Sequence, residues 1–116
     1  MNIGRFGESF ACSYLLNKKF EILERNFYTR IGEIDIIAKM GKDLVFIEVK
    51  TRIGLAAGYP YEAITPKKLS TIRKVGRMYL QKVKTNYRGL RIDVISIVLA
   101  DNLEVIDFQH FENADL

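Results

Sequence analysis

Hydrophobic residues recur along the chain with two different periods, and these periods predict its secondary structure. Near the start, apolar residues return every three or four positions, which predicts an amphipathic helix over residues 4–18. A second helical pattern begins at Thr65 and Pro66, a favourable N-cap and first helical residue, and continues to Lys84. Alternating or continuous apolar runs predict strands over residues 20–28, 32–38, 44–50, 90–99 and 103–108.

The second and third predicted strands form an antiparallel hairpin. Both are rich in β-branched and aromatic residues. The turn between them contains Gly41 and Lys42, and glycine at the first central position supplies the positive φ that a type II′ turn requires. With this two-residue loop, Asp35 is expected to face Glu48 across the hairpin.

One face of this hairpin is expected to be charged and the other apolar. Side chains alternate along a strand, so residues two positions apart share a face. Two strand segments therefore bring carboxylates and an amine together on one side of the sheet. The charged face carries Glu33, Asp35, Glu48 and Lys50, and the apolar face carries Ile34, Ile36, Ile47 and Val49.

Two carboxylates that face each other repel, and a cation would relieve that repulsion. Mg²⁺ prefers oxygen ligands and is usually held by one or two carboxylates, with waters and substrate phosphates completing the shell. Lys50 beside such an ion would orient an attacking water or stabilise charge on a phosphoryl group. This pattern indicates metal-dependent phosphodiester cleavage. It is equally typical of the solvated face of a half-buried sheet, and spacing alone does not separate the two interpretations.

Composition narrows the class of protein. The chain has 116 residues, 48% hydrophobic and 28% charged, which predicts one soluble domain over residues 1–112 with a frayed tail over 113–116. With no membrane-spanning run and no apolar signal core, we expect a cytoplasmic protein. Cys12 is expected to be a small core residue and His110 to lack a partner, which argues against thiolate, zinc and Ser-His chemistry.

Charge is distributed unevenly along the chain. From Thr65 to Arg91 there are nine basic residues and no acidic one, whereas from Asp93 to Leu116 there are six acidic residues and no basic one. The predicted second helix places like charges beside each other instead of pairing opposite ones, which favours phosphate binding over simple solvation. Asp93 is expected to be a structural acid in preference to a metal ligand. The predicted nucleic-acid contacts are Arg52, Lys67, Lys68, Arg73, Lys74 and Arg77.

Several sequence blocks match a known pattern. They include Gly7-Glu8, Gly32-Glu33-Ile34-Asp35, Glu48-Val49-Lys50-Thr51-Arg52 and Thr65-Pro66-Lys67-Lys68. With these blocks, the chain resembles the PD-(D/E)xK nuclease superfamily, in the small branch similar to archaeal Holliday-junction resolvases. It is more closely similar to the bacterial YraN-type family. The resemblance implies an α/β fold with a restriction-endonuclease-like core, αβββαβ(β), whose mixed central sheet is flanked by helices.

The resemblance also implies roles for individual residues. Asp35 and Glu48 match the metal-binding carboxylates, and the backbone carbonyl of Val49 would be a further ligand. Lys50 matches the catalytic lysine, and Glu8 matches the helical glutamate that completes such sites. The implied metal is Mg²⁺ or Mn²⁺. The chain departs from these patterns twice: Ile34 stands where the superfamily's namesake motif has Pro, and Lys19 stands where the YraN-type family commonly has a turn Gly.

These expectations combine into a function. We expect a metal-dependent endonuclease-like protein that hydrolyses DNA phosphodiester bonds, in branched or single-stranded DNA, with little sequence specificity because phosphate contacts carry no base information. A homodimer is expected by analogy with resolvases of this fold. The alternative is a non-catalytic nucleic-acid-binding module that keeps the fold, and a third option is a protein-interaction domain.

Overall fold

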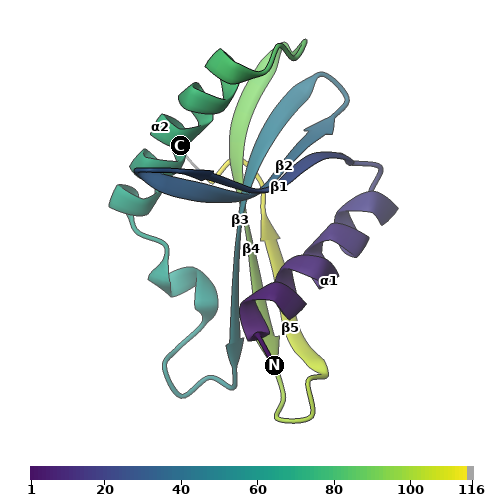
Figure 1. The fold of residues 1–116 in the computed structure, drawn as a ribbon. Coiled ribbons are helices and arrows are strands. Elements are labelled where there is room, and N and C mark those ends of the chain that lie inside the picture. Colours follow the sequence, from purple (N-terminus) through teal and green to yellow (C-terminus); the bar gives the residue numbers. More distant parts are fainter. Residues whose placement is uncertain (115–116) are drawn as a thin grey trace.

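A five-stranded sheet runs through the protein, and a helix covers each of its faces (Figure 1). The computed structural model describes residues 1–114. The predicted α/β class and the predicted element order are both confirmed, with boundaries that differ by at most three residues. The elements are α1 (Ile3–Asn17), β1 (Glu21–Thr29), β2 (Gly32–Met40), β3 (Asp43–Ile53), η1 (Pro60–Ala63), α2 (Pro66–Lys82), β4 (Gly89–Leu99) and β5 (Val105–Phe111).

The sheet is mixed, with the strands in chain order from β1 to β5. Strands β3 and β4 are parallel, and the other neighbouring pairs are antiparallel. Parallel neighbours need a long crossover connection, which here contains η1 and α2. The order αβββαβ(β) and the flanked mixed sheet are compatible with a restriction-endonuclease-like core. Strand β4 is internal, and β5 is an edge strand.

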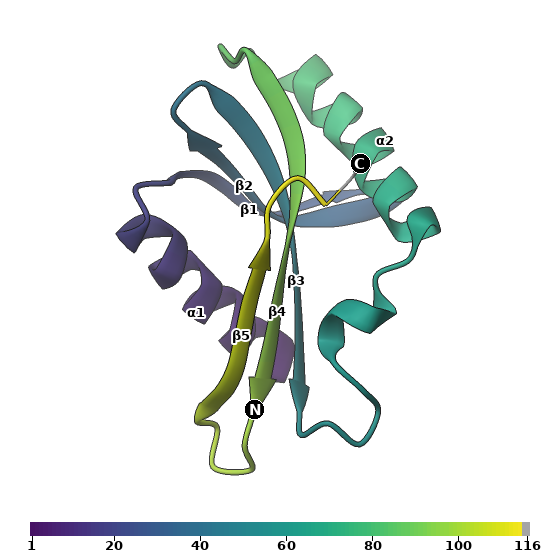
Figure 2. The same ribbon diagram turned by 180° about the vertical axis from the view of Figure 1, so that it is seen from behind.

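The two helices lie on opposite sides of β3 and β4, as both views show (Figure 1; Figure 2). Each helix approaches β3 closely at a glycine. A side chain at Gly7 of α1 would collide with Thr51, and one at Gly76 of α2 would collide with the Phe46 ring. These two contacts fix both helices on the strand that carries Glu48.

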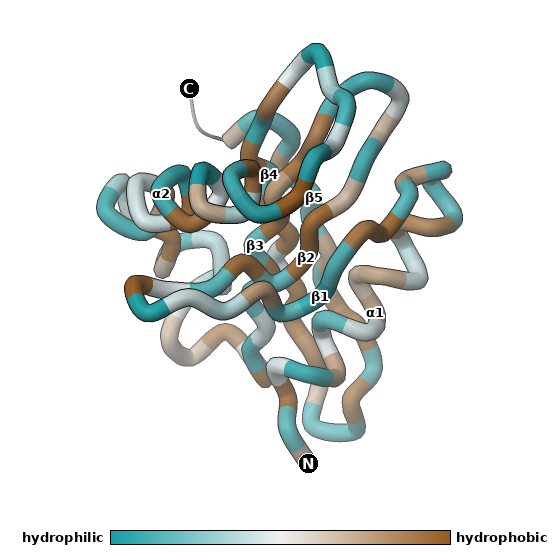
Figure 3. Tube along the Cα trace, turned by 45° about the horizontal axis from the view of Figure 1, so that its top comes forward, coloured by the Kyte–Doolittle hydropathy of each residue, from teal (hydrophilic) through white to brown (hydrophobic). Residues whose placement is uncertain are grey.

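Two hydrophobic clusters form the core, one on each side of the sheet. Figure 3 shows hydrophobic segments along the strands in the middle of the molecule. The α1 cluster contains Ile36, Ile47 and Val49, as the alternation predicts. Ile34, which was predicted on the same face, packs instead in the α2 cluster. The physical reason lies in β1, where Asn26 stands between the Arg25–Ile36 and Phe27–Ile34 pairs, opposite Asp35, and has a φ of 52°. A positive φ is not strand geometry, so regular alternation does not continue through this point of the β1–β2 ladder.

Helix α1 ends in a Schellman motif. The Phe20 N–H donates to the Leu15 carbonyl at 2.9 Å, and the Lys19 N–H donates to the Leu16 carbonyl at 3.1 Å. Lys19 has a φ of 73°, in the left-handed region that favours glycine. The departure at Lys19 therefore changes the residue and keeps the geometry of the turn.

The β2–β3 hairpin has the predicted two-residue loop, with Gly41 at a φ of 61°. The ladder pairs Met40 with Asp43 and ends at Ile36 and Ile47, which is the predicted register. It does not reach the predicted pairs of Asp35 with Glu48 and of Glu33 with Lys50. Within the ladder the prediction is confirmed, but beyond it the two strands are joined differently.

His110 was predicted to lack a partner, and this prediction is wrong. Its Nε2 lies 2.8 Å from Asp93 Oδ2, and its Nδ1 lies 2.8 Å from the Tyr14 hydroxyl. Asp93 is fully buried and also accepts hydrogen bonds from Arg91 and the Asn113 N–H. Burial opposes its charge, but these hydrogen bonds hold the pKa of Asp93 below its ordinary value. Asp93 is thus a structural acid that joins β4, β5 and α1.

Three further expectations concern Cys12, membrane-spanning helices and the C-terminal tail. Cys12 is buried, and burial raises the pKa of its thiol, as expected for a core residue. Over residues 1–114, neither helix is long and apolar enough to cross a membrane. The predicted tail begins with Asn113 and Ala114, whose backbone N–H groups donate to Asp93 and to the Ile92 carbonyl, while 115 and 116 lie outside the described residues.

Candidate active site

The two predicted metal-binding carboxylates are both buried beside the α2 face of the sheet. Asp35 is 6% exposed and Glu48 is 7% exposed. Asp35 Oδ2 accepts a hydrogen bond of 2.9 Å from the Val49 backbone N–H. Since the ladder ends one pair earlier, a side chain joins β2 to β3 at this point, and the Asp35 carboxylate is held beside Glu48.

Burial makes a negative charge unfavourable on both members of this acid pair, Asp35 and Glu48. Burial and the neighbouring Glu48 charge raise the pKa of Asp35 to about 8, although the Val49 N–H opposes the shift. Burial also raises the pKa of Glu48, against the opposing effects of the Lys68 ammonium and a hydrogen bond with Asp35. Two buried carboxylates in contact disfavour double ionisation, so the pair retains a proton near neutral pH unless a cation replaces it.

A lysine from α2 supplies the positive charge closest to this pair. Lys68 Nζ lies 3.5 Å from Glu48 Oε2. The Thr65 hydroxyl, which accepts a 3.1 Å hydrogen bond from the Lys68 N–H, fixes the first turn of α2 and so the position of this lysine. An ammonium group therefore already lies where the acid pair attracts a cation.

A third carboxylate lies close to the pair. Glu33 raises the pKa of both Asp35 and Glu48 by its charge. Its Oε2 atom is buried and has no hydrogen-bond partner among the described residues. Buried polar atoms are rarely left without a partner in proteins. This orphaned oxygen fits a site that is completed by a cation or by water.

Glu8 approaches the site from α1. It is half-buried, and its charge also contributes to the raised pKa of Asp35. Its Oε1 accepts a 2.8 Å hydrogen bond from Asn26 Nδ2. Asn26 is the residue whose positive φ bends β1 opposite Asp35, so one asparagine shapes the hairpin and positions the helical glutamate.

Lys50 and Val49 follow Glu48 on β3 with different surroundings. Val49 is buried, with its N–H bound to Asp35. Lys50 is exposed and, two residues beyond Glu48, shares its face of the sheet. An exposed ammonium at the rim of a buried acid pair can reach a substrate that approaches from solvent.

Two of the predicted nucleic-acid contacts, Arg52 and Lys68, already have partners inside the protein. Arg52 donates to the Ala57 carbonyl at 2.6 Å, so it supports the loop after β3. Lys68 pairs with Glu48. The remaining four predicted contacts also belong to α2. Arg73 is half-buried, and Lys67, Lys74 and Arg77 are exposed.

The side chains around the acid pair supply only part of a metal coordination shell. Within residues 1–114, no three His, Cys, Asp or Glu side chains converge closely enough to form a ready-made metal cluster. A hard cation such as Mg²⁺ needs only one or two carboxylates from the protein, however. The acid pair, the orphaned Glu33 oxygen and the nearby Lys68 ammonium are consistent with that smaller requirement.

Sequence reasoning missed three features of this site. It gave Asn26 no role, although asparagine is among the few residues that tolerate a positive φ. It treated Lys68 only as a phosphate contact, because the ion pair with Glu48 depends on how α2 packs on the sheet. It placed Glu33 on the charged face but could not detect its unpartnered oxygen.

The fold and the site define a small mixed α/β protein with a buried acid pair at the point where two strands separate. Residues 7–97 match the uncharacterised protein family UPF0102, and the chain belongs to this family. The YraN-type family expected from the sequence is thereby confirmed.

The similar proteins span nearly the same length as this chain. A UPF0102 protein of Dictyoglomus thermophilum is 40% identical over 112 residues, which cover 97% of this chain and 95% of the relative. One from Alkaliphilus oremlandii is 46% identical over 114 residues, covering 97% and 96%. One from Clostridium botulinum is 48% identical over 99 residues, covering 84% and 80%.

Proposed function

We propose that this protein is a metal-dependent endonuclease that hydrolyses phosphodiester bonds in DNA, and that it belongs to the PD-(D/E)xK superfamily. The observation that carries the proposal is the buried pair of Asp35 and Glu48, with a Glu33 oxygen near it that has no hydrogen-bond partner within residues 1–114. Such a pair is costly to the fold, because burial raises the pKa of both carboxyl groups and the Glu48 charge raises the pKa of Asp35 further. Strongly perturbed carboxyl groups that face a particular charged partner are typical of functional sites.

In this proposal the acid pair holds Mg²⁺ or Mn²⁺, with the Val49 carbonyl and Glu8 completing the protein ligands. The bound ion would supply Lewis acidity at the scissile phosphate. Asp35 is oriented for this role by the Val49 N–H, and Glu8 by Asn26. Fixed orientation of the ligands matters because catalysis depends on groups that are already in place before the reaction.

Lys50 is assigned to the attacking water. Its ammonium group would donate a hydrogen bond to that water and stabilise negative charge that develops on the phosphoryl oxygens. The exposed position of Lys50 beside the buried Glu48 supports this role. The side chain can reach the phosphate without being buried itself.

Helix α2 would bind the DNA backbone. Its exposed cations include Lys67, Lys74 and Arg77, and Lys68 in its first turn already contacts the acid pair. Each phosphate that these residues neutralise releases counterions, so binding would weaken steeply as salt increases.

A second candidate function is a nucleic-acid-binding module without catalysis. The ion pair between Lys68 and Glu48 favours it, since an internal ammonium can satisfy the carboxylate without any metal. In this alternative α2 binds phosphates and the acid pair has a structural role.

A nicking assay separates the two candidates. Branched and single-stranded DNA would be incubated with Mn²⁺ and the native protein, Asp35→Asn or Lys50→Ala. Cleavage by the native protein, but by neither site variant, supports the endonuclease. The matched controls are Asp101→Asn and Lys42→Ala, both at exposed positions in turns. Cleavage that survives in both site variants indicates a contaminating nuclease, and binding of DNA without cleavage by any variant supports the non-catalytic module.

A further inference from the structure

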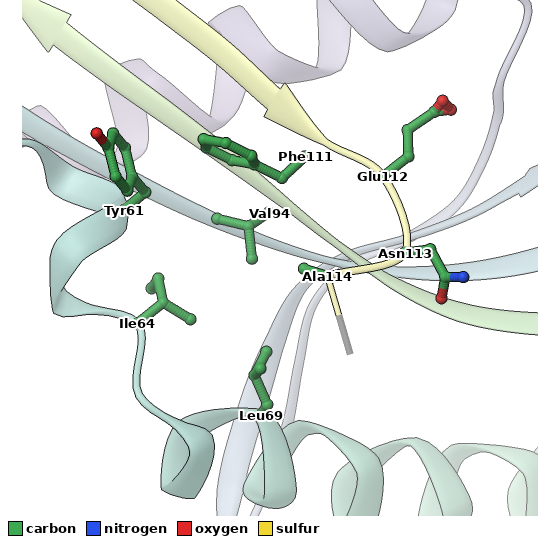
Figure 4. A pocket seen from close by; sticks show the side chains of 8 residues that line it. All are labelled: Tyr61, Ile64, Leu69, Val94, Phe111, Glu112, Asn113 and Ala114. Carbon is green, nitrogen blue, oxygen red and sulfur yellow. The ribbon is translucent and has the colours of Figure 1, made fainter. Parts of the chain in front are cut away.

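A cavity of about 370 Å³ lies on the α2 face of the sheet (Figure 4). This volume is at the lower end of the range typical of small-ligand pockets, about 300–1,000 Å³. Its walls come from η1, α2, β4, the end of β5 and the segment that follows β5. Figure 4 shows the side chains of Tyr61, Val94, Leu69 and Phe111 around the space.

The cavity has aromatic rings along one side. Tyr61 and Phe111 meet edge to face with ring centroids 5.1 Å apart, and Tyr59 stacks on Tyr61 at 5.3 Å. The Tyr61 backbone N–H donates to Ser96 Oγ at 3.1 Å, which fixes this part of η1 against β4. All three rings are half-buried, so their remaining surface faces the cavity or solvent.

The segment after β5 closes the opposite rim. Glu112 and Asn113 belong to the lining and are exposed, but Figure 4 shows their carboxylate and amide groups directed away from the space between Tyr61, Val94 and Leu69. The Glu112 charge is partly balanced by Arg91, whose guanidinium lies 3.5 Å from Glu112 Oε1. The side chains that face the cavity are aromatic or aliphatic, so the cavity suits the apolar face of a flat ring.

This cavity adjoins the acid pair. Its floor residue Val94 is the direct partner of Glu48 in the parallel β3–β4 ladder, so the two side chains share a face on neighbouring strands about 4.8 Å apart. On the other side, Leu69 directly follows Lys68, which contacts Glu48. A ligand in the cavity would lie beside whatever group the acid pair binds.

We propose that this cavity binds an unpaired nucleobase of the nucleotide next to the bound phosphate. The inference rests on the proposed function and specifies its substrate class: nucleic acid that is single-stranded, or that exposes an unstacked base at a branch. Bases stack on aromatic side chains irrespective of sequence, and enzymes that act on nucleic acid commonly hold such bases in apolar pockets. Duplex DNA without an unpaired base would leave the cavity empty.

Binding of oligonucleotides without metal tests this inference separately from cleavage. A labelled single-stranded oligonucleotide and an abasic one of equal length and charge would be titrated with the full chain in the presence of a chelator. The native protein should bind the normal oligonucleotide more tightly. Tyr61→Ala should weaken that binding by about 5- to 150-fold and leave the abasic affinity unchanged, because stacking contributes about this much per base.

Two control variants keep the result interpretable. Tyr61→Phe preserves the ring and should bind as the native protein does. Tyr28→Ala removes an aromatic side chain that is 68% exposed on β1, away from the cavity, and should have no base-dependent effect. Thermal unfolding of each variant would identify any general loss of structure.

The outcomes distinguish this inference from the proposed function. Equal binding of normal and abasic oligonucleotides would overturn the base pocket, would leave a protein segment as the better occupant, and would not affect the endonuclease proposal. Loss of both affinities in Tyr61→Ala, with normal unfolding, would also overturn the base pocket. Failure of the native protein to bind either oligonucleotide would overturn both proposals.

Discussion

At the scale of single residues, the acid pair is the feature on which the proposed function depends. Asp35 and Glu48 are buried together, and the structure answers their repulsion in two ways: a raised pKa and an ion pair with Lys68. The hairpin register predicted that they lie close together, although the ladder ends one pair before them and Asp35 instead binds the Val49 N–H. The contribution of Lys68 could not be predicted, because it depends on the packing of α2 against the sheet.

The raised pKa of Asp35 predicts how stability depends on pH. The unfolded chain releases the Asp35 proton near pH 4, whereas the native protein keeps it until about pH 8. Between these values the native state binds more protons, so the free energy of unfolding falls as pH rises. Asp35→Asn removes this dependence and retains an acceptor for the Val49 N–H.

Urea unfolding at pH 5 and pH 8 measures this effect. Relative to the native protein, Asp35→Asn should become more stable by about 1 kcal/mol or more on going from pH 5 to pH 8, since one pKa unit corresponds to about 1.4 kcal/mol. The exposed Asp101→Asn should follow the native pH dependence. A difference between Asp35→Asn and the native protein that stays constant with pH would contradict the assigned protonation.

The ion pair of Lys68 with Glu48 predicts that this ammonium group competes with a metal ion for the acid pair. Removing its ammonium in Lys68→Ala should increase the affinity for Mn²⁺ about two- to five-fold, a modest effect because the lysine side chain is 40% exposed and solvent screens the pair. Lys67→Ala removes the neighbouring exposed lysine and should leave Mn²⁺ affinity unchanged. Calorimetric titration measures both, and equal Mn²⁺ affinity in the two variants would argue against competition.

At the scale of elements, the hairpin shows where pattern reasoning succeeds and where it stops. The turn at Gly41 and the register that follows from it are as predicted. Ile34 lies on the other side because Asn26 bends β1 opposite Asp35, and a single positive φ is not visible in a hydrophobic pattern. The same bend places Asn26 beside Glu8.

The approach of α2 to β3 predicts an unusual effect of alanine at Gly76. Alanine in place of a helical glycine normally stabilises by about 1 kcal/mol. At Gly76 the new Cβ would collide with the Phe46 ring. Gly76→Ala should therefore destabilise by about 1–3 kcal/mol, the range expected for overpacking.

Thermal or urea unfolding measures this effect. Gly4→Ala in α1 is the matched control, since its Cβ would meet only Asn2 Oδ1 at 3.3 Å. A stabilised Gly76→Ala protein would show that α2 does not pack on Phe46 as described.

At the scale of the whole molecule, the order of elements and the mixed sheet could be predicted, because periodicity and turn signals are local. Contacts between distant segments could not. His110 joins Tyr14 across 96 positions of the sequence and also binds the buried Asp93. The cavity beside the acid pair likewise depends on four elements that only the fold brings together.

The basic and acidic parts of the sequence lie in different parts of the fold. The basic segment forms α2, next to the acid pair, and acidic residues lie on β4, β5 and the segment that follows. Arg91 contacts Asp43, Asp93 and Glu112, so part of the basic excess is balanced within the protein. The exposed cations of α2 are available to attract a polyanion.

The central claim is that Asp35 and Glu48 form a cation site, and calorimetric titration with Mn²⁺ tests it most directly. The native protein should bind one ion per chain, Asp35→Asn should lose most of that affinity, and Asp101→Asn should keep it. Native protein that binds no Mn²⁺, or an Asp35→Asn variant that binds it as tightly as the native chain, would contradict the account.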